Sequence, residues 1–146
     1  MAADPVFVDT NVLVYATRPA AAQHMAAGAA LTRLEDEGSP LWVSLQVLRE
    51  YLAAVTRPQA TAPALPMATA VADVRRFRAI FEVAGEGADV LARLLDLLAA
   101  SRGAGRQVHD ANIVATMLEQ GIRRLLTFNA ADFRRFARVI DVEALP

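Results

Sequence analysis

Short apolar runs alternate with helical stretches along the whole chain. Residues 6–15 (VFVDTNVLVY) place β-branched and aromatic side chains at both odd and even positions, which predicts a strand covered on both faces. Shorter apolar runs predict four more strands, at residues 41–43, 80–83, 124–128 and 139–142. Because short, continuously apolar strands that alternate with helices are typical of parallel sheets, we expect a parallel sheet of four or five strands at the centre of the fold.

Helical periodicity fills the intervals between these strands. It predicts helices over residues 20–37, 46–55, 67–79, 88–100 and from 109 or 110 to 120, with a helical turn at 131–136. Ser44 is placed to cap the second of these helices, and Gly121 to end the fifth. The proline-rich residues 58–66 are interpreted as a connector, because the segment that follows is too short to stand alone. We therefore expect one three-layer α/β domain over residues 1–146.

Composition narrows the class of protein. Of 146 residues, 55% are hydrophobic and 21% are charged, which excludes a disordered acidic tail or a low-complexity linker. The chain has no cysteine, which excludes a disulfide scaffold, an iron–sulfur cluster, a cysteine zinc site and a thiol nucleophile. The N-terminus lacks a basic segment, and the longest uncharged stretches contain prolines and are shorter than a membrane span. We expect a soluble, cytoplasmic protein without a membrane segment.

The basic residues are unusual in kind. All 15 are arginine, although the formal net charge is only −1. Arginine presents a rigid fork of donors that matches phosphate oxygens, but a GC-rich coding sequence produces the same alanine- and arginine-rich composition. Composition alone therefore does not establish nucleic-acid binding, and a nearly neutral chain would need a local basic patch to bind it.

Acidic and amide side chains occur where a parallel sheet gathers its ligands, at the carboxyl ends of the strands. Asp9 interrupts the first apolar strand, where a carboxylate is costly unless it is paired or bound to a metal. Glu50 borders the apolar stripe of its helix, and Asp110 stands at the start of a later helix. The turn after the fourth predicted strand adds Asn129 or Asp132. Taken singly, each also has a structural interpretation, as a cap, an ion pair or a solvated helix residue.

The predicted topology brings these carboxylates to the same edge of the sheet. Two like charges about 4 Å apart repel by about 4 kcal/mol at an effective dielectric constant near 20. Such a cluster needs a divalent cation, a bound arginine or raised pKa values. Oxygen ligands, no cysteine and at most one nearby histidine favour Mg²⁺ or Mn²⁺ over zinc.

Three segments are informative together: residues 6–15 (VFVDTNVLVY), 44–58 (SLQVLREYLAAVTRP) and 108–136 (VHDANIVATMLEQGIRRLLTFNAADFRRF). In this order and spacing they resemble the PIN-domain ribonucleases, and among these the VapC-type toxins of bacterial toxin–antitoxin pairs. The likeness spans the chain from end to end, although residues 58–105 contribute only the layout. It implies a three-layer PIN-like α/β fold, with a central parallel sheet flanked by helices.

The resemblance also implies an acidic site that holds Mg²⁺ or Mn²⁺. Asp9, Glu50 and Asp110 match the family's metal-binding carboxylates. Asn129 stands where many members have an aspartate, and Asp132 lies three residues on, so either is a candidate for the fourth catalytic position. Polar residues that match positions beside the acids, and would orient carboxylates or substrate, are Thr10, Asn11 and Thr127.

The implied activity is endonucleolytic cleavage of RNA. A metal-activated water would attack the phosphate and leave 5′-phosphate and 3′-hydroxyl ends, with Asp110 or Asp9 accepting the proton of that water. Arg102 and Arg106, in a glycine-rich loop, are the first candidates to bind the RNA backbone. Further candidates are Arg123, Arg124, Arg134 and Arg135.

The resemblance implies two protein partners: a small antitoxin that blocks the site, and a second copy of the chain in a homodimer. The expected antitoxin surface is the groove beside the helices near residues 20–37 and 45–57. Two alternatives remain open, a PIN nuclease of RNA processing or decay without a toxin role, and a non-catalytic binding module with the same fold. A nucleotide-binding domain is not supported, because no glycine-rich phosphate loop is present.

Overall fold

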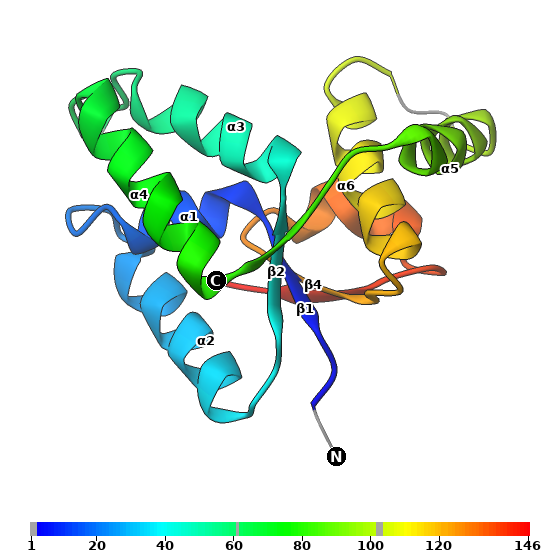
Figure 1. Ribbon diagram of the computed structural model, residues 1–146, viewed down its shortest axis with the longest axis horizontal. Helices are drawn as coiled ribbons and strands as arrows, with labels where there is room; N and C mark the ends of the chain where they lie inside the picture. Colours follow the sequence, from blue (N-terminus) through cyan, green and yellow to red (C-terminus); the bar gives the residue numbers. More distant parts are fainter. Residues whose placement is uncertain (1–2, 61, 102–103) are drawn as a thin grey trace.

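A five-stranded parallel sheet forms the centre of the protein (Figure 1). The computed structural model describes residues 3–60, 62–101 and 104–146. Within them the strands lie in the order β3-β2-β1-β4-β5, and every neighbouring pair is parallel. The strands are β1 (Val6–Val8), β2 (Leu41–Ser44), β3 (Glu82–Ala84), β4 (Arg124–Thr127) and β5 (Asp141–Ala144). The predicted parallel sheet is therefore confirmed.

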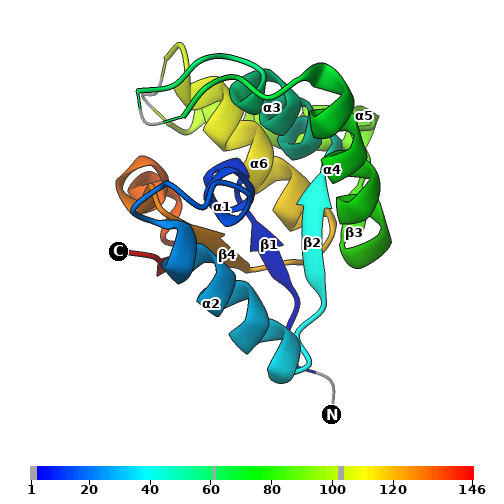
Figure 2. The same cartoon turned by 90° about the vertical axis from the view of Figure 1, so that its left-hand side faces the viewer.

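Helices cover both faces of the sheet. They are α1 (Thr10–Ala16), α2 (His24–Asp36), α3 (Leu45–Val55), α4 (Met67–Ile80), α5 (Ala88–Ala99) and α6 (Gln107–Glu119), followed by a 3-10 segment, η1 (Ala130–Phe136). Figure 1 shows α1 to α4 on one side of β1 and β2 and α5 and α6 on the other, and Figure 2 shows the same layers from the side. The predicted three-layer α/β architecture is confirmed. In the described part of the chain, no helix combines the length and the apolar character needed to cross a bilayer.

The first predicted strand is wrong beyond its third residue. Residues 6–15 were expected as one strand, but β1 ends at Val8 and α1 begins at Thr10. Asp9 causes the change, because its carboxylate accepts a hydrogen bond from the Thr10 N–H (2.8 Å) and caps the new helix. The apolar run continues into α1 because this helix is itself buried among other elements, and a continuously apolar run does not distinguish a strand from a buried helix.

Other element boundaries differ from the prediction by a few residues. The helix α6 begins at Gln107, so Asp110 lies inside its first turn and is not its N-cap. The strand β5 begins at Asp141, two residues later than predicted, because the Ile140 N–H still donates to the Phe136 carbonyl at the end of η1. The strand β3 begins after Phe81, whose N–H still donates to the Phe77 carbonyl at the end of α4.

Local capping explains why α3 matches its prediction well. The Ser44 hydroxyl accepts a hydrogen bond from the Val47 N–H (3.2 Å), which satisfies one of the free donors at the start of the helix. One face of α3 then buries Val47, Leu48, Tyr51 and Val55 in the core. This fixed face determines where the polar residues of α3 emerge, and Glu50 is one of them.

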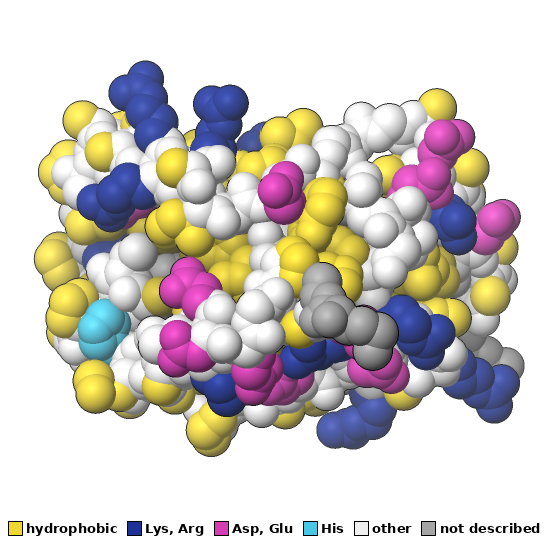
Figure 3. Space-filling view, turned by 60° about the horizontal axis from the view of Figure 1, so that its bottom comes forward, with side chains coloured by type: hydrophobic (Ala, Val, Ile, Leu, Met, Phe, Trp, Pro, Cys, Tyr) yellow, Lys and Arg dark blue, Asp and Glu magenta, His cyan; other side chains and the backbone are white. Residues whose placement is uncertain are grey.

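Charges of both signs are mixed on one face of the molecule. Figure 3 shows this face, with acidic and arginine side chains interspersed among apolar and neutral ones. Exposed ion pairs are part of the same pattern elsewhere in the chain, for example Arg33 with Glu37 (3.0 Å) and Arg123 with Asp141 (3.6 Å). Such exposed pairs contribute little stability. Because charges of both signs are interspersed, the net charge of the chain does not indicate whether it binds nucleic acid. That depends on the local arrangement of charges in the cleft.

Candidate active site

A cleft of about 770 Å³ lies where the chain leaves β1 and β4. This position is expected for ligand sites of parallel α/β sheets, because loops at the carboxyl ends of the strands converge there. The sequence-predicted residues that line it are Asp9, Thr10, Asn11, Glu50, Arg106, Asp110, Asn129 and Asp132. The fold thus brings together acidic side chains from four separate segments of the chain.

Asp9 occupies the deepest position among these acids. Its side chain is buried at the junction of β1 and α1, and each carboxylate oxygen accepts hydrogen bonds. Oδ1 accepts from the Thr10 N–H (2.8 Å), and Oδ2 accepts from Asn11 Nδ2 (3.1 Å) and from the Thr127 hydroxyl (2.8 Å). Hydrogen bonds to both oxygens therefore fix the orientation of the carboxylate.

Burial nevertheless raises the pKa of Asp9 to about 6. Hydrogen bonds from Thr127 and Thr10 stabilise the ionised form and lower the pKa, but they do not offset the loss of water around the carboxylate. The negative charges of Glu50 and Asp110 raise the pKa further. This influence shows that the three carboxylates are near enough to repel one another, so the site favours a proton or a cation next to Asp9.

Asn11 and Thr127 join the loops after β1 and β4. Asn11 Nδ2 donates to the Thr127 hydroxyl (3.3 Å), and Asn11 Oδ1 accepts from the Phe128 N–H (3.1 Å). The Thr127 hydroxyl also accepts from the Asn129 N–H (3.0 Å). Residues more than 110 positions apart in the sequence therefore form one hydrogen-bonded latch, which we call the β1–β4 latch (Asn11, Thr127, Phe128 and Asn129), and Asp9 is attached to it through Asn11 and Thr127.

Glu50 reaches the cleft from the middle of α3 and is half-buried. Its Oε2 accepts a hydrogen bond from the Thr10 hydroxyl (2.9 Å), and its Oε1 accepts one from Gln46 Nε2 (2.8 Å). The bond to Thr10 connects Glu50 to the start of α1, directly after Asp9. Both oxygens of Glu50 are thus oriented by neutral donors.

Asp110 faces the same cleft from the first turn of α6. Its pKa is raised, first by burial and then by the negative charge of Asp132, with a smaller effect of Glu50, while Arg135 and Arg106 act in the opposite direction. Asp132 is therefore an electrostatic neighbour of Asp110. Asn129 also lines the cleft and is uncharged, and its backbone N–H is used in the β1–β4 latch.

The sequence matches the PIN domain family over residues 6–139. The chain belongs to the PIN domain family. A search of curated protein sequences finds no significant match to this PIN domain.

Solved structures with the same fold include several toxin–antitoxin proteins. A chain of VapBC2 from Rickettsia felis, solved with a DNA fragment of its promoter, has 18% identity and a TM-score of 0.70, with 97% of this PIN domain and 98% of that chain covered. VapC20 from Mycobacterium tuberculosis, described as a toxin that cleaves the sarcin–ricin loop, has 23% identity and a TM-score of 0.67, with 97% and 99% covered. A toxin–antitoxin complex from Klebsiella pneumoniae has 20% identity and a TM-score of 0.64, with 93% and 96% covered. At these identities, the likeness shows a shared fold.

The donor set of the PIN domain's cleft fits a hard divalent cation. The cleft is lined by four carboxylates, Asp9, Glu50, Asp110 and Asp132, and their mutual repulsion contributes to the raised pKa values of Asp9 and Asp110. Carboxylate oxygens are the ligands that Mg²⁺ and Mn²⁺ prefer. Within residues 3–60, 62–101 and 104–146, no three Asp, Glu or His side chains already stand close enough together to enclose an ion. The chemistry of the residues fits the metal, while the side chains are held by hydrogen bonds to the protein.

The arginines proposed for RNA binding have different positions. Arg106 lines the cleft, and Arg134 and Arg135 line a neighbouring pocket of about 440 Å³ together with Asp110 and Asp132. Arg102 lies outside the described residues. The pair Arg123 and Arg124 lies at the opposite end of β4 from the cleft, paired with Asp141 and Glu143 respectively.

Sequence reasoning missed three polar residues of this region, Gln46, Arg57 and Asn112. Gln46 is buried and donates to Glu50, and Asn112 Nδ2 in turn donates to Gln46 Oε1 (2.7 Å). Arg57 follows α3 and lines the cleft. One signal for Gln46 was available, because it stands four residues before Glu50 and therefore on the same face of the helix. The role of Asn112 depends on its contact with Gln46, 66 residues away in the sequence.

Proposed function

We propose that this PIN domain is a metal-dependent endoribonuclease and the toxin of a cytoplasmic toxin–antitoxin pair. The observation that carries the proposal is the shared cleft, which four carboxylates from distant segments line and in which neighbouring negative charge helps raise the pKa of Asp9 and Asp110. An acidic cluster of this kind stores repulsion that a bound Mg²⁺ or Mn²⁺ relieves. Bound there, the cation would supply Lewis-acid polarisation of the scissile phosphate and a lower pKa for water.

Each residue of the cleft has a proposed role that follows from its position. Asp9 and Glu50 would hold the cation, since both are oriented by hydrogen bonds that leave them little freedom. Asp110 would complete the ligand set and accept the proton of the attacking water, because it faces the same cleft from the first turn of α6. Asp132 is the fourth acidic residue, as its charge already acts on Asp110, and Asn129 contributes its amide to substrate binding.

The substrate is RNA, bound through its phosphates. Arg106 and Arg57 flank the cleft and supply positive charge beside the carboxylates. Water attack requires no 2′-hydroxyl, so the products carry 5′-phosphate and 3′-hydroxyl ends. The VapC20 likeness supports RNA as the substrate class, because that protein is described as cleaving the sarcin–ricin loop.

The partners are an antitoxin and a second copy of the chain. An arginine of the antitoxin fits the acidic cleft, where it pairs with carboxylates and competes with the cation. The proposed docking surface is formed by α2 and α3, and Met25 on α2 is 80% exposed. For the homodimer the supporting feature is α5, which leaves Leu91 and Leu95 more than half exposed. Antitoxin co-purification and light scattering at several concentrations test these two partners.

The decisive experiment incubates purified protein with total RNA in Mg²⁺, Mn²⁺ or EDTA and maps the cut ends. We expect cleavage with either metal, none in EDTA, and ends of the stated chemistry. Asp9→Asn should abolish cleavage, whereas Asp96→Asn, an exposed carboxylate on α5, is the matched control and should leave it unchanged. Cleavage that resists EDTA, or a wild type inert in both metals, would refute the nuclease proposal. Cleavage without growth arrest on expression would instead indicate an RNA-processing PIN nuclease.

A further inference from the structure

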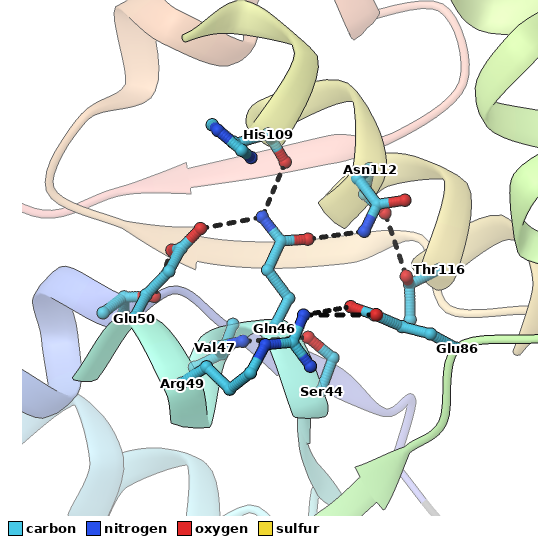
Figure 4. Close-up of polar contacts among 10 residues, drawn as sticks. Ser44, Gln46, Val47, Arg49, Glu50, Glu86, His109, Asn112 and Thr116 are labelled. Atoms are coloured by element: carbon cyan, nitrogen blue, oxygen red, sulfur yellow. Dashed lines mark hydrogen bonds and ion pairs between the residues drawn. The ribbon is translucent and has the colours of Figure 1, made fainter. Parts of the chain in front are cut away.

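Gln46 is a buried amide between two of the acidic residues. It lies in the first turn of α3, on the same face as Glu50, and is only 5% exposed. A polar side chain in such a position is costly unless its hydrogen bonds are satisfied. Figure 4 shows that they are, because the amide points at α6 and at Glu50.

Both ends of this amide are used. Nε2 donates to Glu50 Oε1 (2.8 Å) and to the His109 carbonyl (2.9 Å), and Oε1 accepts from Asn112 Nδ2 (2.7 Å). An amide nitrogen has two hydrogens, so Gln46 has no donor left over. A carboxylate or an apolar side chain of the same length would break at least two of these bonds. The arrangement therefore requires a donor and an acceptor on one short group.

The two hydrogen bonds that Gln46 Nε2 donates link Glu50 to the backbone next to Asp110. One ends on the carboxylate of Glu50, and the other ends on the backbone of the residue immediately before Asp110. The third bond anchors the amide to Asn112, on the far side of Asp110 in the same helix. Gln46 thus spans 63 residues of sequence to tie the face of α3 that carries Glu50 to the first turn of α6.

We infer that Gln46 is a positioning residue that sets the place of Glu50 relative to Asp110, and so the affinity of the cleft for its divalent cation. The inference rests on the proposed function, since it concerns the same site. Gln46 acts through Glu50 and the α6 backbone and does not itself line the cleft. Removal of groups that orient metal ligands typically weakens metal binding about 10–100-fold.

The test measures Mn²⁺ binding by electron paramagnetic resonance without RNA. We expect Gln46→Met to weaken Mn²⁺ binding about 10–100-fold, and Gln46→Glu, which places a carboxylate against Glu50, to weaken it at least as much. Asn112→Ala removes only the anchor of the amide and should cause a smaller loss. Gln120→Met, an exposed glutamine after α6, is the matched control and should bind Mn²⁺ like the wild type.

A double-mutant cycle separates positioning from a purely structural role. In a Glu50→Ala background the amide has no carboxylate to orient, so Gln46→Met should cause little further loss of Mn²⁺ affinity. Hydrogen exchange of metal-free protein should show faster exchange in residues 107–112 of Gln46→Met, with exchange in α2 unchanged. Thermal unfolding identifies any variant that fails to fold, and Asn112→Ala then replaces it in the cycle.

Each outcome decides a different question. An equal loss in both backgrounds, or unchanged Mn²⁺ affinity in folded Gln46→Met and Gln46→Glu, overturns the inference and leaves the nuclease proposal intact. A wild type that binds Mn²⁺ but cuts no RNA refutes the proposed function, while the cycle still decides the role of Gln46. A wild type that binds no Mn²⁺ overturns both.

Discussion

Asp9→Asn should make the metal-free protein more stable at neutral pH while it removes activity. The pKa of Asp9 is raised to about 6 in the folded protein, against 3.8 for an ordinary aspartate. Because the folded state binds this proton more tightly than the unfolded chain, the free energy of unfolding falls as the pH rises from about 4 to about 6. Above that range the ionised carboxylate costs roughly 3 kcal/mol, at about 1.36 kcal/mol for each pH unit between the two pKa values.

The substitution removes this cost but adds a smaller one. In the wild type, Asn11 and Thr127 both donate hydrogen bonds to the Asp9 carboxylate. The NH₂ group of an asparagine at position 9 would face one of these donors, and this mismatch destabilises the folded protein by about 1 kcal/mol. The net expectation is a gain of about 2 kcal/mol at pH 8 and a change near zero at pH 4.5. For a chain of this length, a gain of that size raises Tm by about 4–8 °C.

The assay is urea unfolding followed by circular dichroism in EDTA at both pH values. Wild type and Asp96→Asn provide the reference, because Asp96 is exposed on α5. An Asp9→Asn protein that is less stable than the wild type at pH 8 would show that the carboxylate is not destabilised by burial. A gain that is the same at pH 4.5 and pH 8 would show that proton binding by Asp9 is not its source.

Three further predictions concern the same cleft. Arg106→Ala should weaken RNA binding and reduce the slope of log Kd against log salt by about 0.7, the value for one single-strand phosphate contact. Arg123→Ala, at the other end of β4, should leave both unchanged, and filter binding between 50 and 300 mM salt measures the two slopes. Thr127→Val should lower the free energy of unfolding by about 1–3 kcal/mol in urea titrations, because the buried β1–β4 latch loses its hydroxyl, and a change under about 0.5 kcal/mol would contradict the latch. Asp132→Asn should lower the pKa of Asp110 in metal-free protein and Asn129→Ala should not, as followed by carboxyl carbon NMR; equal effects would contradict the assignment of Asp132 as the fourth acid.

Local signals made much of the fold predictable. Ser44 caps α3 because its hydroxyl needs only the backbone three residues on, so a short sequence window contains the whole cause. The strands were recognisable because buried parallel strands are continuously apolar. The same property caused the error at residues 9–15, where a buried helix follows a buried strand and only Asp9 marks the boundary.

The acidic residues of the candidate site could be predicted from the sequence, but the residues that orient them could not. Topology alone places residues that follow β1 and β4 at one edge of the sheet, so Asp9 and Asp132 could be expected near each other. Gln46 could not be recognised in the same way, because its importance comes from a carbonyl 63 residues away, on an element whose approach to α3 the sequence does not encode locally. The choice between Asn129 and Asp132 likewise depends on charge proximity to Asp110.

The β1–β4 latch also determines when the cleft can be completed during synthesis of the chain. Asn11 is synthesised before its partners Thr127 and Phe128, which follow it by 116 and 117 positions. While these residues remain inside the exit tunnel, Asp9 lacks the Thr127 hydroxyl and the cleft lacks Asp132. A nascent chain therefore carries an incomplete cleft until the residues of β4 and η1 have left the exit tunnel.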